Sequence, residues 1–288
     1  MTDSFIAELP NRAVLRLRGA EHVPFLQGLV TCDVAHIEAD QAVYGALLTP
    51  QGKFLYDFFI AREGDSLLLE TEAARFDELL KRLTMYRLRA KVDLIDERDA
   101  WRVYALVGQS PNQPLPAGSV AFDDPRLGDL GARALVPANA EALPATTGFD
   151  AYDRHRLALG VPDGSRDLEI DKAILLENGF DELHGVAFDK GCFVGQELTA
   201  RTKHRGLIRK RLLPVRIDGM APDTGTTLTL DDKEAGVMRS RNGDLGLALL
   251  RLERIAPALA GQVPLSSGDT RLWPYVPDWM RLPEQRVA

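Results

Sequence analysis

The segment KGCFVGQELTARTKHRG, which begins at Lys190, places one cysteine between two glycines and ahead of a basic run. Gly191 and Gly195 can adopt backbone conformations that are closed to other residues, so the loop can hold Cys192 at a surface or in a cleft. Residues 196–201 are compatible with a helix, whose positive N-terminal end would favour a thiolate together with Lys190. We therefore expect Cys192 to act chemically, with Lys190 beside it. The structural alternative is a small buried residue in a tight turn.

Two kinds of chemistry are open to such a thiol. A nucleophilic cysteine normally needs a histidine base, and neither His184 nor His204 lies in a recognisable protease signature. A stable metal site needs several ligands, and the sequence has no CxxC pair and no cluster of cysteines and histidines. We therefore expect no stably bound metal, although the chain could lend one ligand to a transient cluster.

Basic residues gather in two segments of a chain whose formal net charge is −7. Seven Lys or Arg residues and no acid occur from Arg201 to Arg216, and YRLRAKV contains Arg87, Arg89 and Lys91. Each segment is either a solvated face or a site for an anion, such as a carboxylate tail, a phosphate or an acidic partner. Both interpretations stay open from the sequence.

One acid stands in an otherwise apolar strand. Asp57 lies in LYDFFI, directly after the turn residues TPQGK. If its side chain points inward, it is a desolvated carboxylate that needs a partner, which is often a sign of function. The alternation of residues along this strand leaves its direction open.

Composition limits the class of protein. The 288 residues are 45% hydrophobic and 27% charged, which is typical of soluble globular proteins with two or three domains. The acidic balance argues against nucleic acid and membrane partners, and no apolar run has the length of a spanning helix. The first residues, MTDSFIAELPNR, do not resemble a signal peptide. The two cysteines, Cys32 and Cys192, are far apart in sequence, and we expect a cytoplasmic protein without disulfides.

The order of predicted elements indicates an α+β fold. Alternating or apolar runs predict strands at residues 13–19, 43–48, 54–61, 66–71, 91–95 and 101–107. Helices are expected at 21–30, after residue 75 and from residue 150, and the two strands that flank TPQGK are expected to form a hairpin. The proline-rich residues 111–119 are expected to form a loop between lobes. Short strands separated by turn signals predict a small β-barrel from about residue 208.

These segments resemble one family. KGCFVGQE is similar to the signature of the YgfZ proteins, which are relatives of the glycine-cleavage T-protein (aminomethyltransferase) and include mitochondrial iron–sulfur cluster assembly factors. FLQGLVTCDV, LLTPQGKFLYDF, YRLRAKV and GLALLRLE also resemble this family, so the resemblance covers nearly the whole chain. It implies a three-domain, T-protein-like (GcvT-like) α+β fold around a central channel that holds tetrahydrofolate. Two interleaved domains would occupy residues 1–207, and a C-terminal β-barrel residues 208–288.

The resemblance also implies which residues act. We expect Cys192 and Lys190 to carry the chemistry. We expect the folate-binding residues to be Asp57, Arg89, Lys91, Arg133, Gln196, Glu197 and Arg201. Of the two aspartates that T-proteins have after the hairpin turn, only Asp57 remains here, and Arg133 stands in GARALVP where T-proteins carry a folate-binding glutamate. We therefore do not expect aminomethyl transfer from a lipoyl carrier, whereas we do expect folate binding. For Gln196 and Glu197 we expect hydrogen bonds that fix the loop.

The sequence thus predicts a folate-binding accessory protein that assembles or repairs [4Fe–4S] clusters, with cluster carriers or client proteins as partners. It is not expected to be an enzyme in the ordinary sense. One alternative is a tetrahydrofolate-dependent one-carbon transferase with Asp57 as its acid or base. Another is an interaction module that docks cluster carriers through its basic surface.

Overall fold

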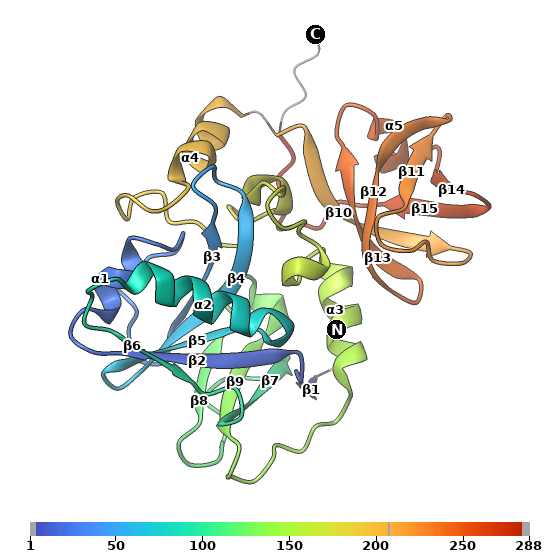
Figure 1. The fold of residues 1–288 in the computed structure, drawn as a ribbon. Coiled ribbons are helices and arrows are strands. Elements are labelled where there is room, and N and C mark those ends of the chain that lie inside the picture. The colour runs from blue at the N-terminus through green and yellow to red at the C-terminus, as the bar shows by residue number, and fades with distance from the viewer. Residues whose placement is uncertain (1–3, 207, 284–288) are drawn as a thin grey trace. The chain divides into compact units, whose positions relative to one another are not determined.

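The computed structural model describes residues 4–206 and 208–283 (Figure 1). The chain divides into two compact units, and each unit is built from two separate stretches. The first unit comprises Met1–Tyr152 and Leu183–Gln196, and the second comprises Asp153–Glu182 and Glu197–Ala288. The boundary that we expected after residue 207 falls on a residue outside the described part of the chain. The predicted fold class, α+β with a C-terminal β-barrel, is confirmed.

A five-stranded antiparallel sheet of order β3-β4-β5-β2-β6 forms the first half of unit 1. Its strands are β2 (Arg12–Arg18), β3 (Ala42–Leu48), β4 (Phe54–Glu63), β5 (Ser66–Glu72) and β6 (Asp93–Asp96). The helices of this half are α1 (His22–Gln27) and α2 (Phe76–Arg87). The predicted hairpin is β3–β4, in which Tyr44 lies opposite Phe59.

Helix α2 covers one face of this sheet. Its buried Phe76, Leu79 and Leu83 recur at helical spacing and pack in one core with Phe58 and Ile60 of β4. Phe58 and Ile60 alternate with residues that point to the opposite face, because successive strand residues face opposite sides of a sheet. That opposite face therefore carries Asp57 and Phe59.

A second antiparallel sheet of order β1-β7-β9-β8 completes unit 1. Its strands are β1 (Phe5–Glu8), β7 (Trp101–Val107), β8 (Val120–Asp123) and β9 (Ala132–Pro137). Residues 111–119 connect β7 to β8 within this one sheet, so the prediction of a loop between lobes is wrong. Prolines and glycines mark a turn, but they do not show whether the strands on either side join the same sheet.

Unit 2 contains a closed barrel of order β10-β13-β12-β11-β14-β15, as predicted from its short strands and turn signals. The strands are β10 (Lys210–Asp218), β11 (Thr227–Leu230), β12 (Lys233–Asn242), β13 (Leu245–Arg251), β14 (Leu265–Ser267) and β15 (Thr270–Pro274). Val215, Met238, Leu250 and Leu272 are buried together in its core. A short helix, α5 (Ala256–Leu259), follows β13, whereas α3 (Phe149–Leu159) and α4 (Gln196–Arg205) each begin in unit 1 and continue into unit 2. No helix of the described chain is both long and apolar enough to cross a membrane.

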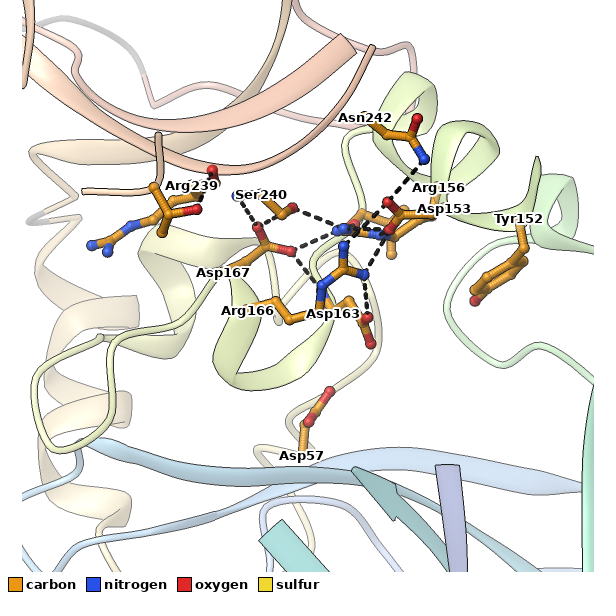
Figure 2. Close-up of polar contacts among 12 residues, drawn as sticks. Asp57, Tyr152, Asp153, Arg156, Asp163, Arg166, Asp167, Arg239, Ser240 and Asn242 are labelled. Atoms are coloured by element: carbon orange, nitrogen blue, oxygen red, sulfur yellow. Dashed lines mark hydrogen bonds and ion pairs between the residues drawn. The ribbon is translucent and has the colours of Figure 1, made fainter. Parts of the chain in front are cut away.

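Buried charges tie the segment after α3 to the barrel inside unit 2 (Figure 2). The guanidinium of Arg156 lies 2.7 Å from the carboxylate of Asp153 and 2.6 Å from that of Asp167. Asp167 in turn accepts hydrogen bonds from the backbone N–H and the hydroxyl of Ser240 in β12. The aspartates neutralise the buried arginine, and the network fixes this segment to β12.

Candidate functional site

The loop that carries Cys192 runs from the end of unit 1 into α4, and it leaves the thiol exposed. Its neighbour Phe193 is buried, so the loop is packed against the protein on one side of the cysteine. Gly191 has φ +97° and Gly195 has φ +82°, conformations that favour glycine. The expectation that two glycines shape this loop is confirmed, as is the start of a helix at Gln196.

Lys190 fixes the beginning of the loop. Its half-buried amine donates hydrogen bonds to the carbonyl oxygens of Val30 and Cys32, both at 2.6 Å, and lies 5.5 Å from the centre of the Phe193 ring. Burial lowers the pKa of this amine, and the nearby negative charge of Asp33 opposes the shift. We expected Lys190 to act on the neighbouring thiol; the structure instead shows its amine bound to backbone that lies far away in the sequence.

Gly195 and Gln196 fix the other end of the loop. A Cβ atom on Gly195 would lie 2.5 Å from the carbonyl oxygen of Thr49 and 2.8 Å from the Cβ of Leu48, so the glycine backbone packs directly against the turn of the β3–β4 hairpin. The side-chain amide of Gln196 donates a hydrogen bond to the carbonyl of Gly191 at 3.2 Å. The predicted loop-fixing role of Gln196 is therefore confirmed.

The other cysteine, Cys32, differs from Cys192 in both exposure and environment. Cys32 is buried, and a Cβ on Gly45 would lie 2.4 Å from its sulfur, so strand β3 covers it closely. Burial raises the pKa of the Cys32 thiol to about 12, and the nearby charge of Lys190 only partly opposes this. A thiol that is both covered and protonated at neutral pH is unreactive. Of the two cysteines, Cys192 is therefore the one whose thiol is accessible for a reaction or for ligand binding.

Asp57 is buried on the face of the first sheet that lies opposite α2. Its Oδ2 accepts a hydrogen bond from the hydroxyl of Tyr44 at 3.0 Å, and its backbone carbonyl accepts one from Thr71 at 3.1 Å. Burial raises the pKa of Tyr44 well above its usual range, and the charge of Asp57 raises it further, so the phenol remains a donor. The direction that the sequence left open is thereby settled: Asp57 points inward.

Arg133 lies buried in the same unit and bridges the two sheets. From β9 its guanidinium reaches Glu70 of β5 at 2.6 Å, Asp124 at 3.2 Å and the hydroxyl of Tyr152 at 2.8 Å. It also stacks over the ring of Phe59, 3.9 Å from the ring centre. The charge of Arg133 is thus balanced by acids within the fold.

Arg126 connects this cluster to the surroundings of Asp57. It binds Asp124 through two nitrogens at 2.9 and 2.8 Å, and its guanidinium lies 5.3 Å from the centre of the Tyr44 ring. Tyr44 is hydrogen-bonded to Asp57, and Asp124 is hydrogen-bonded to Arg133. Arg126 contacts both Tyr44 and Asp124, so a short series of buried contacts connects Asp57 with Arg133. Two of the predicted folate-binding residues therefore belong to one network.

Arg89 and Lys91 are not part of that network. Both are exposed after the end of α2, where they line a surface depression of about 480 Å³. Helix α2 packs on one face of the first sheet, whereas Asp57 points from the other. The structure does not bring Arg89 or Lys91 together with Asp57.

Glu197 and Arg201 are exposed on α4 and belong to unit 2. The basic run that begins with Arg201 does not form a single face. Lys203 pairs with Asp181, whereas Arg211 is buried and pairs with Glu182 at 2.8 Å. These contacts favour a structural role for part of the run.

Sequence reasoning missed the partners of the predicted residues, namely Tyr44, Glu70, Asp124, Arg126 and Tyr152. The sequence contains one weak indication that Glu70 is buried, because this acid lies in the largely apolar strand segment SLLLETE. In the described residues, no group of three or more His, Cys, Asp or Glu is arranged to hold a metal ion. What the arrangement offers chemically is one accessible thiol on a loop that is fixed at both ends.

Comparisons with known proteins agree with this fold. The family model "CAF17, C-terminal beta-barrel domain" matches residues 209–282. The human iron–sulfur cluster assembly factor IBA57 is 36% identical over 301 residues, which cover 94% of this chain and 84% of that protein. The IBA57 homologue of Chaetomium globosum is 30% identical over 364 residues, which cover 96% and 83%. The crystal structure of glycine cleavage system aminomethyltransferase T from Bartonella henselae matches with a TM-score of 0.71 at 15% identity over 96% of this chain and 86% of that one. This last likeness confirms the T-protein-like fold.

The names of these relatives correct one expectation. The human, mouse and Chaetomium globosum proteins are all named as mitochondrial. The prediction of a cytoplasmic protein, which rested on the low cysteine content, is therefore wrong. Few cysteines indicate a reducing compartment, but they do not distinguish one such compartment from another.

Proposed function

Because the chain belongs to the family of the IBA57 iron–sulfur cluster assembly factors, we propose that it is an accessory protein in the assembly or repair of [4Fe–4S] clusters and acts through Cys192. One observation carries the choice of residue: the Cys192 thiol is exposed on a loop that Lys190 and Gly195 hold at its two ends. A residue needed only for packing would be covered, as Cys32 is.

A cysteine thiol has the chemistry that cluster assembly requires. Cysteine thiolate is a soft ligand that binds iron–sulfur clusters. A cluster requires several such ligands, and Cys192 supplies one, so the other ligands would come from the protein that delivers or receives the cluster. The cluster is cargo in this scheme. The fixed loop presents the sulfur without a change of backbone, which lowers the entropic cost of forming a shared site.

We also propose that a reduced folate binds in unit 1 near Asp57. The support is a pair of acidic side chains on one face of the sheet. One is Asp57, and the other is the buried Glu70, which lies opposite Phe59 on the neighbouring strand. Within residues 4–206 and 208–283, Oε2 of Glu70 accepts no hydrogen bond. Glu70 sits next to Arg133, so it supplies an acid close to the position where T-proteins have theirs. The N–H groups of a pterin fit such acceptors, and Phe59 offers an apolar wall.

The deciding experiment is a clean deletion of the gene followed by two separate assays. We expect the activities of [4Fe–4S] enzymes to fall while glycine cleavage is unchanged. The wild-type chain should restore the cluster enzymes, and Cys192→Ser should not. Loss of glycine cleavage instead would replace the proposal with a one-carbon transferase.

A further inference from the structure

The end of α2 exposes apolar side chains beside unpaired cations. Leu88 is 87% exposed and Met85 is 69% exposed, values that are unusual for large apolar residues. Arg87, Arg89 and Lys91 surround them, and in the part of the chain that the structure describes the side chains of these three residues take part in no hydrogen bond or ion pair. We call residues 85–91 the α2-end surface.

The surface has a concave side. A depression of about 480 Å³ is lined by residues 87–93 together with Gly19 and Ala20. The acid in this lining, Asp93, already faces Arg18 at 3.4 Å. The depression is therefore positively charged in a chain with a net charge of −7, and it is large enough for a few side chains of a bound segment.

The backbone beneath the surface is held in place. Leu88 has φ +47° and ψ −105°, a conformation that is strained for a residue with a side chain. Lys91 donates its N–H to the Glu21 carboxylate at 2.6 Å, and its carbonyl accepts the N–H of Glu21 at 3.2 Å. A Cβ on Gly19 would lie 2.5 Å from the same carbonyl, so the chain is closely packed there. Leu88 is thus presented outward by ordered structure.

We propose that the α2-end surface docks an acidic segment of a partner protein that carries an apolar side chain. Carboxylates of the segment pair with Arg87, Arg89 and Lys91, and its apolar side chain packs against Leu88 and Met85. An extended polyanion such as nucleic acid, or an anionic membrane, would meet the repulsion of the acidic remainder of the chain, whereas a short peptide contacts the cationic depression alone. The inference rests on the proposed function in one respect, since a cluster assembly factor must meet carriers or clients.

The test uses fluorescence anisotropy with a fluorescein-labelled peptide of glutamate and leucine. The full chain should bind this peptide, and binding should weaken with added salt. The double variant Arg87→Glu, Arg89→Glu should weaken binding at least about tenfold. Leu88→Gly should weaken it about threefold to tenfold while leaving the unfolding free energy equal or higher, because glycine relieves the strained φ.

A matched control is a double variant in unit 2. Met220 is as exposed as Leu88, and Lys233 is an exposed cation, so Met220→Gly with Lys233→Glu removes one exposed apolar side chain and reverses one exposed positive charge elsewhere. This control should bind the peptide as the wild type does. Peptide binding that is equal in all variants would overturn the proposal. So would preferential binding to phosphatidylserine vesicles, or full displacement of the peptide by a polyglutamylated folate.

The outcome is separable from that of the proposed function. Cys192→Ser should keep its affinity for the peptide even though it fails in cells. The Arg87→Glu, Arg89→Glu variant should keep the alkylation rate of Cys192 at its wild-type value. Failure of peptide binding alone would therefore remove the docking surface and leave the role of Cys192 standing.

Discussion

The amine of Lys190 lies 2.6 Å from the carbonyl oxygen of Cys32, so the segment of the buried cysteine anchors the loop of the exposed one. Replacing Lys190 by methionine removes this donor and leaves the carbonyls of Val30 and Cys32 without it. We expect Lys190→Met to lower the unfolding free energy by about 1–3 kcal/mol, measured by urea denaturation. Lys233→Met, at an exposed lysine of β12, should change it by less than about 0.5 kcal/mol. Equal effects would mean that the two hydrogen bonds contribute nothing.

The two glycines of the loop should differ in their tolerance of alanine. Both have positive φ, which costs an alanine roughly 1–2 kcal/mol. A Cβ on Gly191 meets nothing within 4 Å, whereas one on Gly195 meets Thr49 at 2.5 Å. Gly195→Ala should therefore destabilise the chain by about 1–3 kcal/mol more than Gly191→Ala, because crowding adds to the backbone term. Denaturation of both variants measures the difference, and equal losses would contradict the packing of Gly195 against the hairpin turn.

Cys192→Ser should separate chemistry from packing. The thiol is exposed, so serine should leave the unfolding free energy within about 0.5 kcal/mol of the wild-type value. The variant should nevertheless fail to restore [4Fe–4S] enzyme activity in a deletion strain. Iodoacetamide should label Cys192 in the folded wild type well before Cys32, whose thiol is buried and has a raised pKa. A serine variant that complements fully would leave the loop with a structural role only.

Asp57→Asn should weaken the binding of tetrahydrofolate at least about tenfold, since an amide offers one acceptor and no charge to the N–H groups of a pterin. Tyr44→Phe is the informative companion, because it removes the hydrogen bond to Oδ2 and keeps the carboxylate. It should weaken binding less than Asp57→Asn does. Titration calorimetry on both variants, with thermal unfolding as a check on folding, measures this. Equal affinity of the wild type and Asp57→Asn would exclude Asp57 from the site.

The buried acid Asp124 should make the first unit sensitive to low pH. Burial alone would raise its pKa, but the charge of Arg126, the hydrogen bond from Arg126 and the charge of Arg133 together bring it below the usual value. A lowered carboxyl pKa stabilises the fold fully above the unfolded pKa, and this stabilisation is lost as the pH falls through the folded value. Asp124→Asn should therefore cost about 3–5 kcal/mol at neutral pH.

The cost of Asp124→Asn should shrink as the pH falls from about 4, the usual carboxyl pKa, through the lowered pKa of the folded state, below which the wild-type carboxylate is protonated whether the chain is folded or unfolded. Urea denaturation of both chains across that range measures the difference, and other acids cancel in the comparison. A cost that does not change with pH would show that Asp124 is not ionised in the folded state.

Local patterns predicted the hairpin, the barrel and the glycine-shaped loop, because each depends on residues that are close in the sequence. The direction of Asp57 could not be predicted, since α2 covers one face of its sheet and the charged cluster around Arg133 covers the other. A strand that is buried on both faces has an almost continuously apolar sequence. The alternation of polar and apolar residues then cannot show which face a side chain points to. The role of Lys190 was also out of reach, because its partners Val30 and Cys32 belong to a distant part of the chain. No local pattern marks a lysine that binds backbone carbonyls.

The division of unit 1 into two stretches sets an order of events during synthesis. Residues 1–152 leave the ribosome first, and residues 183–196 follow only after a segment that belongs to unit 2. Until then the carbonyls of Val30 and Cys32 lack the Lys190 amine, and the hairpin turn lacks Gly195. The exposed cysteine therefore belongs to the last stretch of its unit to be made, and it arrives on a scaffold whose two sheets have already been translated. A nascent chain that stops before residue 183 carries Cys32 alone and lacks the exposed thiol.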